Sequence, residues 1–260
     1  MINTVLFDMG GTLEDIGHSR ESELECGTRI LRYLRKQGMD LNMSPDVFIQ
    51  AADQGHRQYK SWADRTLREL MPYEIWSEWK LKGLDLDQRK LRAISEKISY
   101  IWEITYYQRK LRPDAKKLLE TLRASGYRLG VISNTSSLTQ VYKVLDEYGI
   151  KDYFEVITLS CMCGYKKPSP VLFEVTLAEI NALPSETVYV GDTVSRDVMG
   201  ARNAGLALSI RIDSEMTESS DYNLDAGTPD ADYVVNNLFD IFDILEKVNL
   251  KLAKNGLQNL

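Results

Sequence analysis

Short apolar segments of strand length recur along the second half of the chain, and a stretch with helical character follows each of them. Strands are predicted at residues 127–132, 155–159, 187–190, 206–210 and 233–235. Helices are predicted between Pro113 and Gly126 and at residues 137–147, 168–181, 195–204 and 238–248. Strands that alternate with helices in this way indicate a parallel sheet covered by helices.

Residues 14–109 follow a different pattern, with many charged and aromatic side chains and with apolar residues at helical spacing, such as Ile30, Leu31 and Leu34. No convincing strand is visible in this segment. We therefore expect an all-helical insertion, with helices at residues 20–37, 44–62, 72–81 and 86–108.

The two patterns together predict an α/β fold with one inserted subdomain. The parallel-sheet core is expected to contain residues 1–13 and 110–250, and the helical cap residues 14–109. Residues 251–260 have few apolar side chains and are expected to form a frayed C-terminal tail.

Polar side chains that could bind a ligand or take part in a reaction come directly after several of the predicted strands. Asp8-Met9-Gly10-Gly11-Thr12 follows the apolar run Val5-Leu6-Phe7, and Ser133-Asn134 follows the strand at 127–132. Lys166-Lys167-Pro168 and Gly191-Asp192, with Asp197 shortly after, come later in the chain. Because open α/β sheets bind ligands at the carboxyl ends of their strands, these segments predict one common site.

The four segments, in this order, resemble the motifs of the haloacid dehalogenase (HAD) superfamily. The resemblance implies a Rossmann-like core, a type 1 helical cap inserted between the first and second motifs, and phosphatase-like activity. It implies that Asp8 is a nucleophile that forms an aspartyl-phosphate, although an aspartate in this place could also serve only as a turn or capping residue. The remaining residues implied to contact the phosphate or the substrate are Ser133, Lys167, Gly11, Thr12 and Asn134.

A phosphate and a carboxylate repel each other, so a divalent cation is expected between them. Mg²⁺ prefers oxygen ligands, and the resemblance implies Asp8, the backbone carbonyl of Gly10 and Asp192 as those ligands. Asp197 is expected close by, where it could orient metal-bound water or Lys167. The alternative role for Asp192 is that of a helix cap.

Gly10 is a departure from the pattern, because phosphatases of this family usually have a second aspartate at this position as general acid. Such a group contributes about 10²- to 10⁴-fold in rate, so activity on ordinary alkyl phosphates could be impaired. Phosphates with a good leaving group would be tolerated. Glu14, Asp15 or His18, at the entry to the cap, could replace the missing acid or could be ordinary hinge residues.

Two other functions stay open at this point. One is a pseudo-enzyme that binds phosphate and Mg²⁺ without turnover. The other is a phosphonate hydrolase that uses a cap lysine as a Schiff base, although Lys60, Lys80 and Lys82 are each expected to be exposed on helices. Dehalogenation is disfavoured because the acidic metal site is present. Lys166 competes with Lys167 for the phosphate but is expected to be solvated.

Composition limits the partners. The chain has 260 residues, 43% hydrophobic content and a net charge of -6, which argues against nucleic-acid binding. It has no signal peptide pattern, no apolar run that could span a membrane and only three cysteines, so a cytoplasmic location is expected. A small phosphorylated metabolite is the expected substrate, selected by cap side chains among His56, Arg57, Tyr59, Trp62 and Arg65. The oligomeric state is not predicted.

Overall fold

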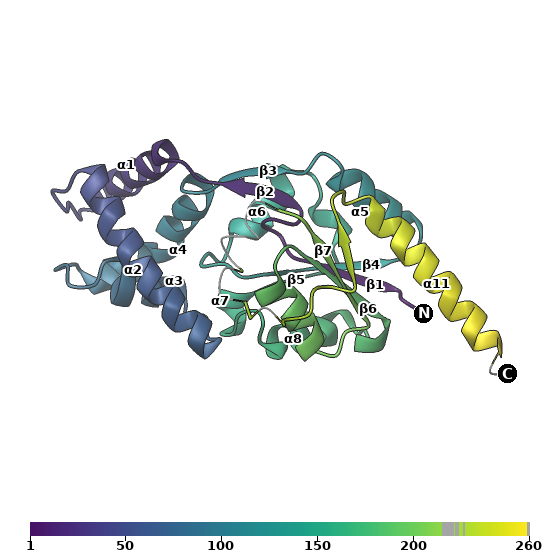
Figure 1. The fold of residues 1–260 in the computed structure, drawn as a ribbon. Coiled ribbons are helices and arrows are strands. Elements are labelled where there is room, and N and C mark those ends of the chain that lie inside the picture. The colour runs from purple at the N-terminus through teal and green to yellow at the C-terminus, as the bar shows by residue number, and fades with distance from the viewer. Residues whose placement is uncertain (215–220, 222–223, 226, 259–260) are drawn as a thin grey trace.

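A six-stranded parallel sheet forms the centre of the protein, in the order β5-β4-β1-β6-β7-β8 (Figure 1). The computed structural model describes residues 1–260 except 215–220, 222–223, 226 and 259–260. The strands of the sheet are β1 (Thr4–Phe7), β4 (Arg128–Ser133), β5 (Val156–Leu159), β6 (Thr187–Gly191), β7 (Leu208–Ile212) and β8 (Tyr233–Val235). The prediction of an α/β fold with a Rossmann-like parallel sheet is confirmed.

Strand β1 lies at the centre of the sheet between β4 and β6, and all four of its residues are buried. Phe7 is in register with Val131 on one side and Val190 on the other. This register brings the carboxyl ends of three strands to the same edge of the sheet. The residues that follow Phe7, Ile132 and Val190 therefore meet there, as the motif positions predicted.

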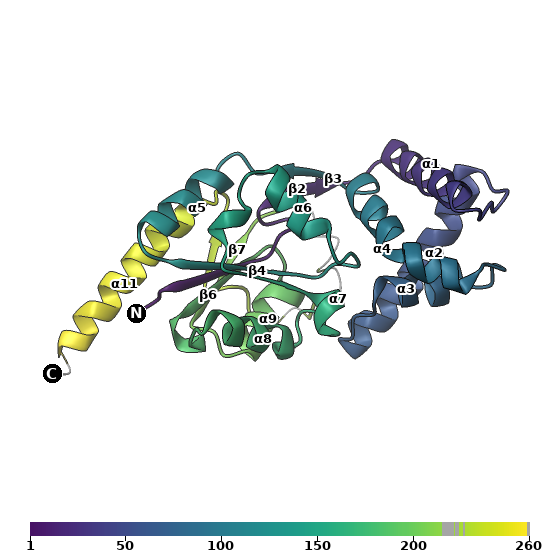
Figure 2. The same ribbon diagram turned by 180° about the vertical axis from the view of Figure 1, so that it is seen from behind.

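Helices cover both faces of the sheet. On one face, Val5 and Phe7 belong to the same apolar cluster as residues of α5 (Ala115–Ala124), α6 (Gln140–Glu147) and α11 (Asp240–Gln258). On the other face, Leu6 packs in a cluster with residues of α8 (Pro170–Ile180) and α9 (Met199–Asn203). Successive residues of a strand point to opposite faces, so β1 contributes to both layers. Figures 1 and 2 show α5 and α11 on one side of the sheet and α8 on the other.

The cap stands at one end of the core and has an apolar cluster of its own (Figure 2). This cluster contains Ile30, Phe48, Trp76, Leu91 and Trp102, all buried. Serine or aspartate caps begin three of its helices, which explains why these begin where they do. The cap elements are α1 (Arg20–Lys36), α2 (Pro45–Thr66), α3 (Pro72–Ile75), the π-helix η1 (Trp76–Lys80) and α4 (Gln88–Thr105).

Two short strands join the cap to the core, and the prediction that residues 14–109 contain no strand is wrong. Strand β2 (Glu14–Gly17) pairs antiparallel with β3 (Gln108–Leu111), so the helix expected at 86–108 ends earlier, at Thr105. The four-residue strands lack a clear apolar alternation, and a tertiary contact stabilises their pairing instead. Arg109 Nη1 lies 2.9 Å from Glu14 Oε2, and Glu14 is buried.

The frayed tail expected at residues 251–260 is also wrong for the part that the structure describes. Helix α11 continues to Gln258, while residues 259–260 of the predicted tail lie outside the described residues. Its middle is tied to the N-terminal strand, because the side-chain amide of Asn249 exchanges hydrogen bonds of 2.8 and 2.9 Å with the backbone of Ile2. Neither α11 nor any other described helix combines the length and apolar character needed to cross a membrane.

Lys80 is buried, contrary to the expectation of an exposed helix lysine. Only 2% of it is exposed, and its Nζ lies 3.3 Å from the ring centroid of Trp102 and 4.7 Å from that of Trp76. Burial lowers its pKa to about 7. The sequence pattern missed this because the π-helix η1 turns Lys80 toward the apolar cluster, where the Trp rings supply a cation–π contact instead of water.

Replacing this lysine tests the cost of its burial. A lysine whose folded pKa is about 7 destabilises the fold most below pH 7, and the cost decreases by about 1.4 kcal/mol per pH unit as the pH rises toward the unfolded pKa. Lys80→Met should therefore stabilise the protein at pH 6.5 by roughly 3 kcal/mol more than at pH 9. Urea unfolding at both pH values measures the difference. A gain in the free energy of unfolding that is equal at both pH values, or larger at pH 9, would contradict the lowered pKa of Lys80.

Candidate active site

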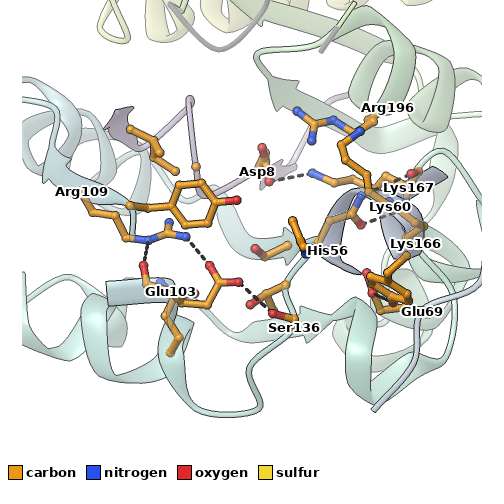
Figure 3. A pocket seen from close by; sticks show the side chains of 18 residues that line it. Asp8, His56, Lys60, Glu69, Glu103, Arg109, Ser136, Lys166, Lys167 and Arg196 are labelled. Carbon is orange, nitrogen blue, oxygen red and sulfur yellow. Dashed lines mark hydrogen bonds and ion pairs between the residues drawn. The ribbon is translucent and has the colours of Figure 1, made fainter. Parts of the chain in front are cut away.

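Asp8 lies at the carboxyl end of β1 and faces a cavity of about 170 Å³ between the core and the cap (Figure 3). The core contributes Ser133 and Lys167 to its wall, while the cap contributes residues of α2. Asp8 is buried, and its backbone N–H donates a 2.8 Å bond to the carbonyl of Val190 on β6. The residue predicted from the sequence as the nucleophile is thus held at a strand end and faces a partly open cavity.

Lys167 connects Asp8 with the downstream motif. Its Nζ lies 2.7 Å from Asp8 Oδ1 (Figure 3). It also lies 2.7 Å from Asp197 Oδ1 and donates a 2.9 Å bond to the hydroxyl of Tyr189. Burial lowers the pKa of this ammonium, but the carboxylates of Asp197 and Asp8 outweigh burial and raise it. The lysine is therefore charged and fixed by three contacts at physiological pH.

Asp197 has the most hydrogen bonds of the motif carboxylates. Its Oδ2 accepts bonds from the backbone N–H of Asp192 (3.3 Å), the N–H of Thr193 (3.0 Å) and the Thr193 hydroxyl (2.6 Å). Burial opposes its ionisation, but Lys167 and Arg196 outweigh burial and lower its pKa to about 2. The geometry agrees with a group that orients Lys167 and the turn that carries Asp192.

Three carboxylates come together in a way that suits a hard cation. Oxygen atoms of Asp8, Asp192 and Asp197 all lie within 4.8 Å of one another, and all three residues are buried. Burial and the nearby charge of Asp197 raise the pKa of Asp192 to about 7, which shows how strongly the cluster resists a third negative charge. Oxygen donors in a buried anionic cluster fit Mg²⁺ by their chemistry.

The turn after Asp8 depends on a glycine. Gly11 has a φ of +84°, and a Cβ there would lie 2.2 Å from Asp192 Oδ2, so no other residue fits without displacing that carboxylate. The Gly11 carbonyl accepts a 2.9 Å bond from Arg112, a residue that sequence reasoning missed. Gly11 and Thr12, which the motif implied as substrate contacts, shape this turn but do not line the cavity.

Ser133 and Asn134 both line the cavity, as the motif implied. The side chain of Asn134 also bridges two loops: its Oδ1 accepts a 2.9 Å bond from the Lys167 N–H, and its Nδ2 donates a 3.3 Å bond to the Lys167 carbonyl. The second motif thereby holds the backbone of the third. A direct substrate contact by Asn134 stays a prediction.

An apolar side chain occupies the space beside Gly10. A Cβ on Gly10 would lie 2.4 Å from Ile16 Cδ1 and 3.6 Å from Arg109 Nη1. Its backbone is not in the left-handed region, so the obstacle to a larger residue is the side chain of the hinge strand rather than backbone strain. The space beside Gly10 is therefore bounded by an apolar side chain and a guanidinium.

The three hinge residues considered as replacement acids do not line the cavity. Glu14 accepts a 3.0 Å bond from the Tyr148 hydroxyl in addition to its pairing with Arg109, and burial raises its pKa. Asp15 pairs at the surface with Arg112, and His18 is half exposed beside Glu23. In this arrangement none of the three is placed to donate a proton to a leaving group.

Lys166 is not solvated as expected. It is 8% exposed, it lines the cavity and its Nζ lies 2.6 Å from Asp64 Oδ1 on cap helix α2. The adjacent lysines of the third motif thus have separate partners, one in the core and one in the cap. Sequence spacing could not show this, because Asp64 reaches Lys166 only through the packing of the cap.

Several cavity residues were not among the sequence candidates. Arg196 extends toward Asp8 and Lys167 in Figure 3. Burial lowers the pKa of its guanidinium, but the carboxylates of Asp192, Asp197 and Asp8 outweigh burial and raise it. Its position between the two aspartates of the last motif was the one available signal. The other missed cavity residues are Ile16, Glu69, Glu103, Tyr107, Arg109, Thr135, Ser136 and Gln140.

The cap residues expected to select the substrate divide into two groups. His56 and Tyr59 line the cavity, and His56 lies between Asp8 and Lys166 in Figure 3. Burial and neighbouring cations lower the pKa of His56 well below its usual value. Arg57, Trp62 and Arg65 are not part of the cavity wall, because they lie on other faces of α2.

Comparison with known sequences agrees with this geometry. The model of a haloacid dehalogenase-like hydrolase family matches residues 2–205. The chain is 30% identical over 255 residues to a glyceraldehyde 3-phosphate phosphatase of Pyrococcus furiosus, covering 95% of each chain. It is also 30% identical over 249 residues to a ribulose-1,5-bisphosphate 5-phosphatase of Halopiger xanaduensis, covering 94% of this chain and 100% of the relative.

Solved structures show the same fold. A HAD phosphatase from Thermococcus onnurineus superimposes with a TM-score of 0.55 at 26% identity, covering 94% of this chain and 98% of the other. CbbY from Rhodobacter sphaeroides, in complex with phosphate, superimposes with a TM-score of 0.61 at 20% identity, covering 93% and 96%. The motif residues lie together at one edge of the sheet, and the family model and the relatives match most of the chain. The chain therefore belongs to the haloacid dehalogenase-like hydrolase family.

Proposed function

We propose that the protein is a Mg²⁺-dependent phosphatase that acts on a small phosphorylated metabolite through an aspartyl-phosphate at Asp8. The observation that carries the proposal is the buried row of Asp8, Lys167 and Asp197, with Lys167 Nζ 2.7 Å from a carboxylate oxygen on each side. Asp8 and Lys167 line a partly open cavity of about 170 Å³. The phosphatase names of its relatives support the same reaction.

In the proposed reaction, Asp8 attacks phosphorus, and an O–P bond forms as the bond to the leaving oxygen breaks. Water then attacks the aspartyl-phosphate, releasing phosphate and regenerating the carboxylate. Burial raises the pKa of Asp8, whereas the charge and hydrogen bond of Lys167 favour the ionised form that can attack. In this proposal Ser133 holds a non-transferring phosphate oxygen, and its position on the cavity wall supports that role.

The proposed metal ligands are Asp8, Asp192 and the backbone carbonyl of Gly10, with Asp197 supporting them from behind. Bound there, Mg²⁺ would offset the charge of phosphate and nucleophile. Lys167 lies between two of the three clustered carboxylates, and the charge of Arg196 also acts on all three. Three carboxylates and a dianionic phosphate still outnumber these two cations, which supports a divalent metal ion as part of the proposal.

The leaving group is expected to be one that needs little protonation. Ile16 fills the space beside Gly10, and the three hinge acids do not line the cavity. A leaving alkoxide is a strong base, whereas a carboxylate or a phenolate leaves without a proton. We therefore propose faster turnover of acyl and aryl phosphates than of simple alkyl phosphates.

The substrate is proposed to be short. The cavity of about 170 Å³ lies below the usual range of roughly 300 to 1,000 Å³ for ligand pockets, so it suits a molecule with few heavy atoms beyond the phosphate. Lys60, Lys166 and Arg109 add positive charge to its wall. Relatives named for glyceraldehyde 3-phosphate and ribulose bisphosphate suggest a sugar phosphate. Such an ester has an alkoxide leaving group, so the leaving-group argument predicts that it is hydrolysed more slowly than an aryl or acyl phosphate.

A phosphonate hydrolase is the second candidate, favoured by one cap lysine on the cavity wall. Lys60 lines the cavity, whereas Lys80 and Lys82 do not. Its Nζ lies 2.7 Å from Asp64 Oδ2, so attack on a substrate carbonyl would require this ion pair to break. This contact makes phosphoester hydrolysis the stronger proposal.

Replacing the nucleophile tests the covalent mechanism and also separates an enzyme from a pseudo-enzyme. Asp8→Asn removes the anionic oxygen with little change of shape, so Mg²⁺-dependent hydrolysis of 4-nitrophenyl phosphate should fall to background. The melting temperature should change by less than about 4 °C. Asp85→Asn, an exposed cap position, is the matched control and should keep full activity. Wild-type protein without hydrolysis, or a fully active Asp8→Asn variant, would refute the proposal.

Restoring the missing acid tests the leaving-group argument. Gly10→Asp alone should destabilise the protein, because its Cβ would lie 2.4 Å from Ile16 Cδ1, and Gly10→Asp with Ile16→Ala should recover stability. The double variant should increase kcat/KM for propyl phosphate by about 10-fold or more and change that for 4-nitrophenyl phosphate by less than about 3-fold. Ile16→Ala alone is the control. A folded double variant with equal changes on both substrates would show that protonation does not limit the rate.

A further inference from the structure

Glu96, on cap helix α4, accepts four hydrogen bonds from a single segment of the core. The donors are the Ser137 hydroxyl (2.8 Å), the Leu138 N–H (2.7 Å), and the N–H (3.1 Å) and hydroxyl (2.7 Å) of Thr139. The bonded residues are more than forty positions apart in the sequence and belong to different subdomains. One cap carboxylate thus accepts hydrogen bonds from the segment that precedes a core helix.

The helix that begins there, α6, depends on this contact for its first turn. The side chain of its N-cap residue, Thr139, makes no capping bond to the helix. Instead, the Gln140 N–H donates a 3.1 Å bond to the Ser137 hydroxyl, which itself donates to Glu96. A negative charge at a helix N-terminus is favourable, so Glu96 caps α6 from outside the core.

Gln140, the first residue of α6, lines the same cavity as Asp8. It is 1% exposed, and in the described part of the chain its side-chain Nε2 has no hydrogen-bond partner. Buried amide groups in proteins nearly always have a partner, and one that does not is suited to a group that arrives from elsewhere. Because Gln140 lines the cavity, a small rotation of its side chain would let a bound molecule supply the missing acceptor.

The segment from Ser133 to Gln140 runs from the phosphate end of the cavity toward the cap. Ser133 and Asn134 begin it beside Lys167, and Figure 3 shows Ser136 on the side of the cavity away from Asp8. Ser136 is also held by the cap, because its hydroxyl donates a 3.0 Å bond to Glu103 Oε1. The end of the segment therefore faces the part of a substrate that is not the phosphate.

Resting on the phosphatase function proposed above, we propose that Gln140 is a specificity-determining residue that donates a hydrogen bond to a hydroxyl or carbonyl oxygen of the substrate. Glu96 is its positioning residue, since it fixes Gln140 only while the cap lies on the core. The site then selects short hydroxylated phosphate esters over apolar esters of the same length. A site built to bond such an oxygen rejects the analogue that lacks it, because the donor stays unpaired.

Two esters that differ only in their hydroxyl groups, glycerol 3-phosphate and propyl phosphate, test this selection. Their dissociation constants are measured by calorimetry with Mg²⁺ present, on full-length protein with Asp8→Asn so that neither ester is turned over. Gln140→Met and Glu96→Gln are each added to that background. Glu25→Gln, an exposed carboxylate of the cap helix α1, is the matched control. Thermal melting of each variant checks the fold.

Asp8→Asn protein should bind glycerol 3-phosphate about 5- to 10-fold more tightly than propyl phosphate. Gln140→Met and Glu96→Gln should each reduce this ratio to about 1, mainly by weakening glycerol 3-phosphate binding, and Glu25→Gln should preserve it. Equal binding of the two esters by Asp8→Asn protein, or an unchanged ratio in Gln140→Met, would overturn the role of Gln140. A ratio lost in Gln140→Met but kept in Glu96→Gln would overturn the role of Glu96. Failure of the phosphatase proposal would appear separately, as absent hydrolysis by the wild-type protein.

Discussion

The site depends on the ion pairs that the ammonium group of Lys167 makes with two carboxylates. The ammonium lies 2.7 Å from Asp8 and 2.7 Å from Asp197, two buried carboxylates that would otherwise repel each other in a medium of low dielectric constant. The register of β1 with its neighbours brings these groups to one edge of the sheet. Asn134 then fixes the backbone of the lysine, so strand order, loop contact and charge balance act together.

The contact between cap and core differs from the interior of either part. Each has its own apolar clusters, whereas acidic side chains of the cap meet hydroxyl and amine groups of the core. The boundary is therefore more polar than either interior, although Ile104 of α4 also packs against the core cluster. The cap-to-core pairs are Asp64 with Lys166, Glu69 with Ser160, Glu96 with Thr139, and Glu103 with Ser136.

The absence of a carboxyl group at position 10 is visible in the sequence, but its structural meaning is not. Only the pairing of the hinge strands brings Ile16 so close that a Cβ on Gly10 would lie 2.4 Å from its Cδ1, with Arg109 beside it. An apolar group and a fixed cation lie there, and neither is a carboxylic acid. The proposed preference for leaving groups that depart as stable anions depends on this arrangement.

The sequence by itself determined the parallel sheet and the positions of Asp8, Ser133, Lys167 and Asp192 at its edge. Apolar periodicity and motif order are local signals, and strand ends in a parallel sheet must share an edge. The tertiary structure alone decided the hinge strands, the burial of Lys80 and Lys166, and the placement of Glu96 and Gln140. These features depend on partners distant in the chain, and a charged side chain becomes buried only where folding brings its partner to it.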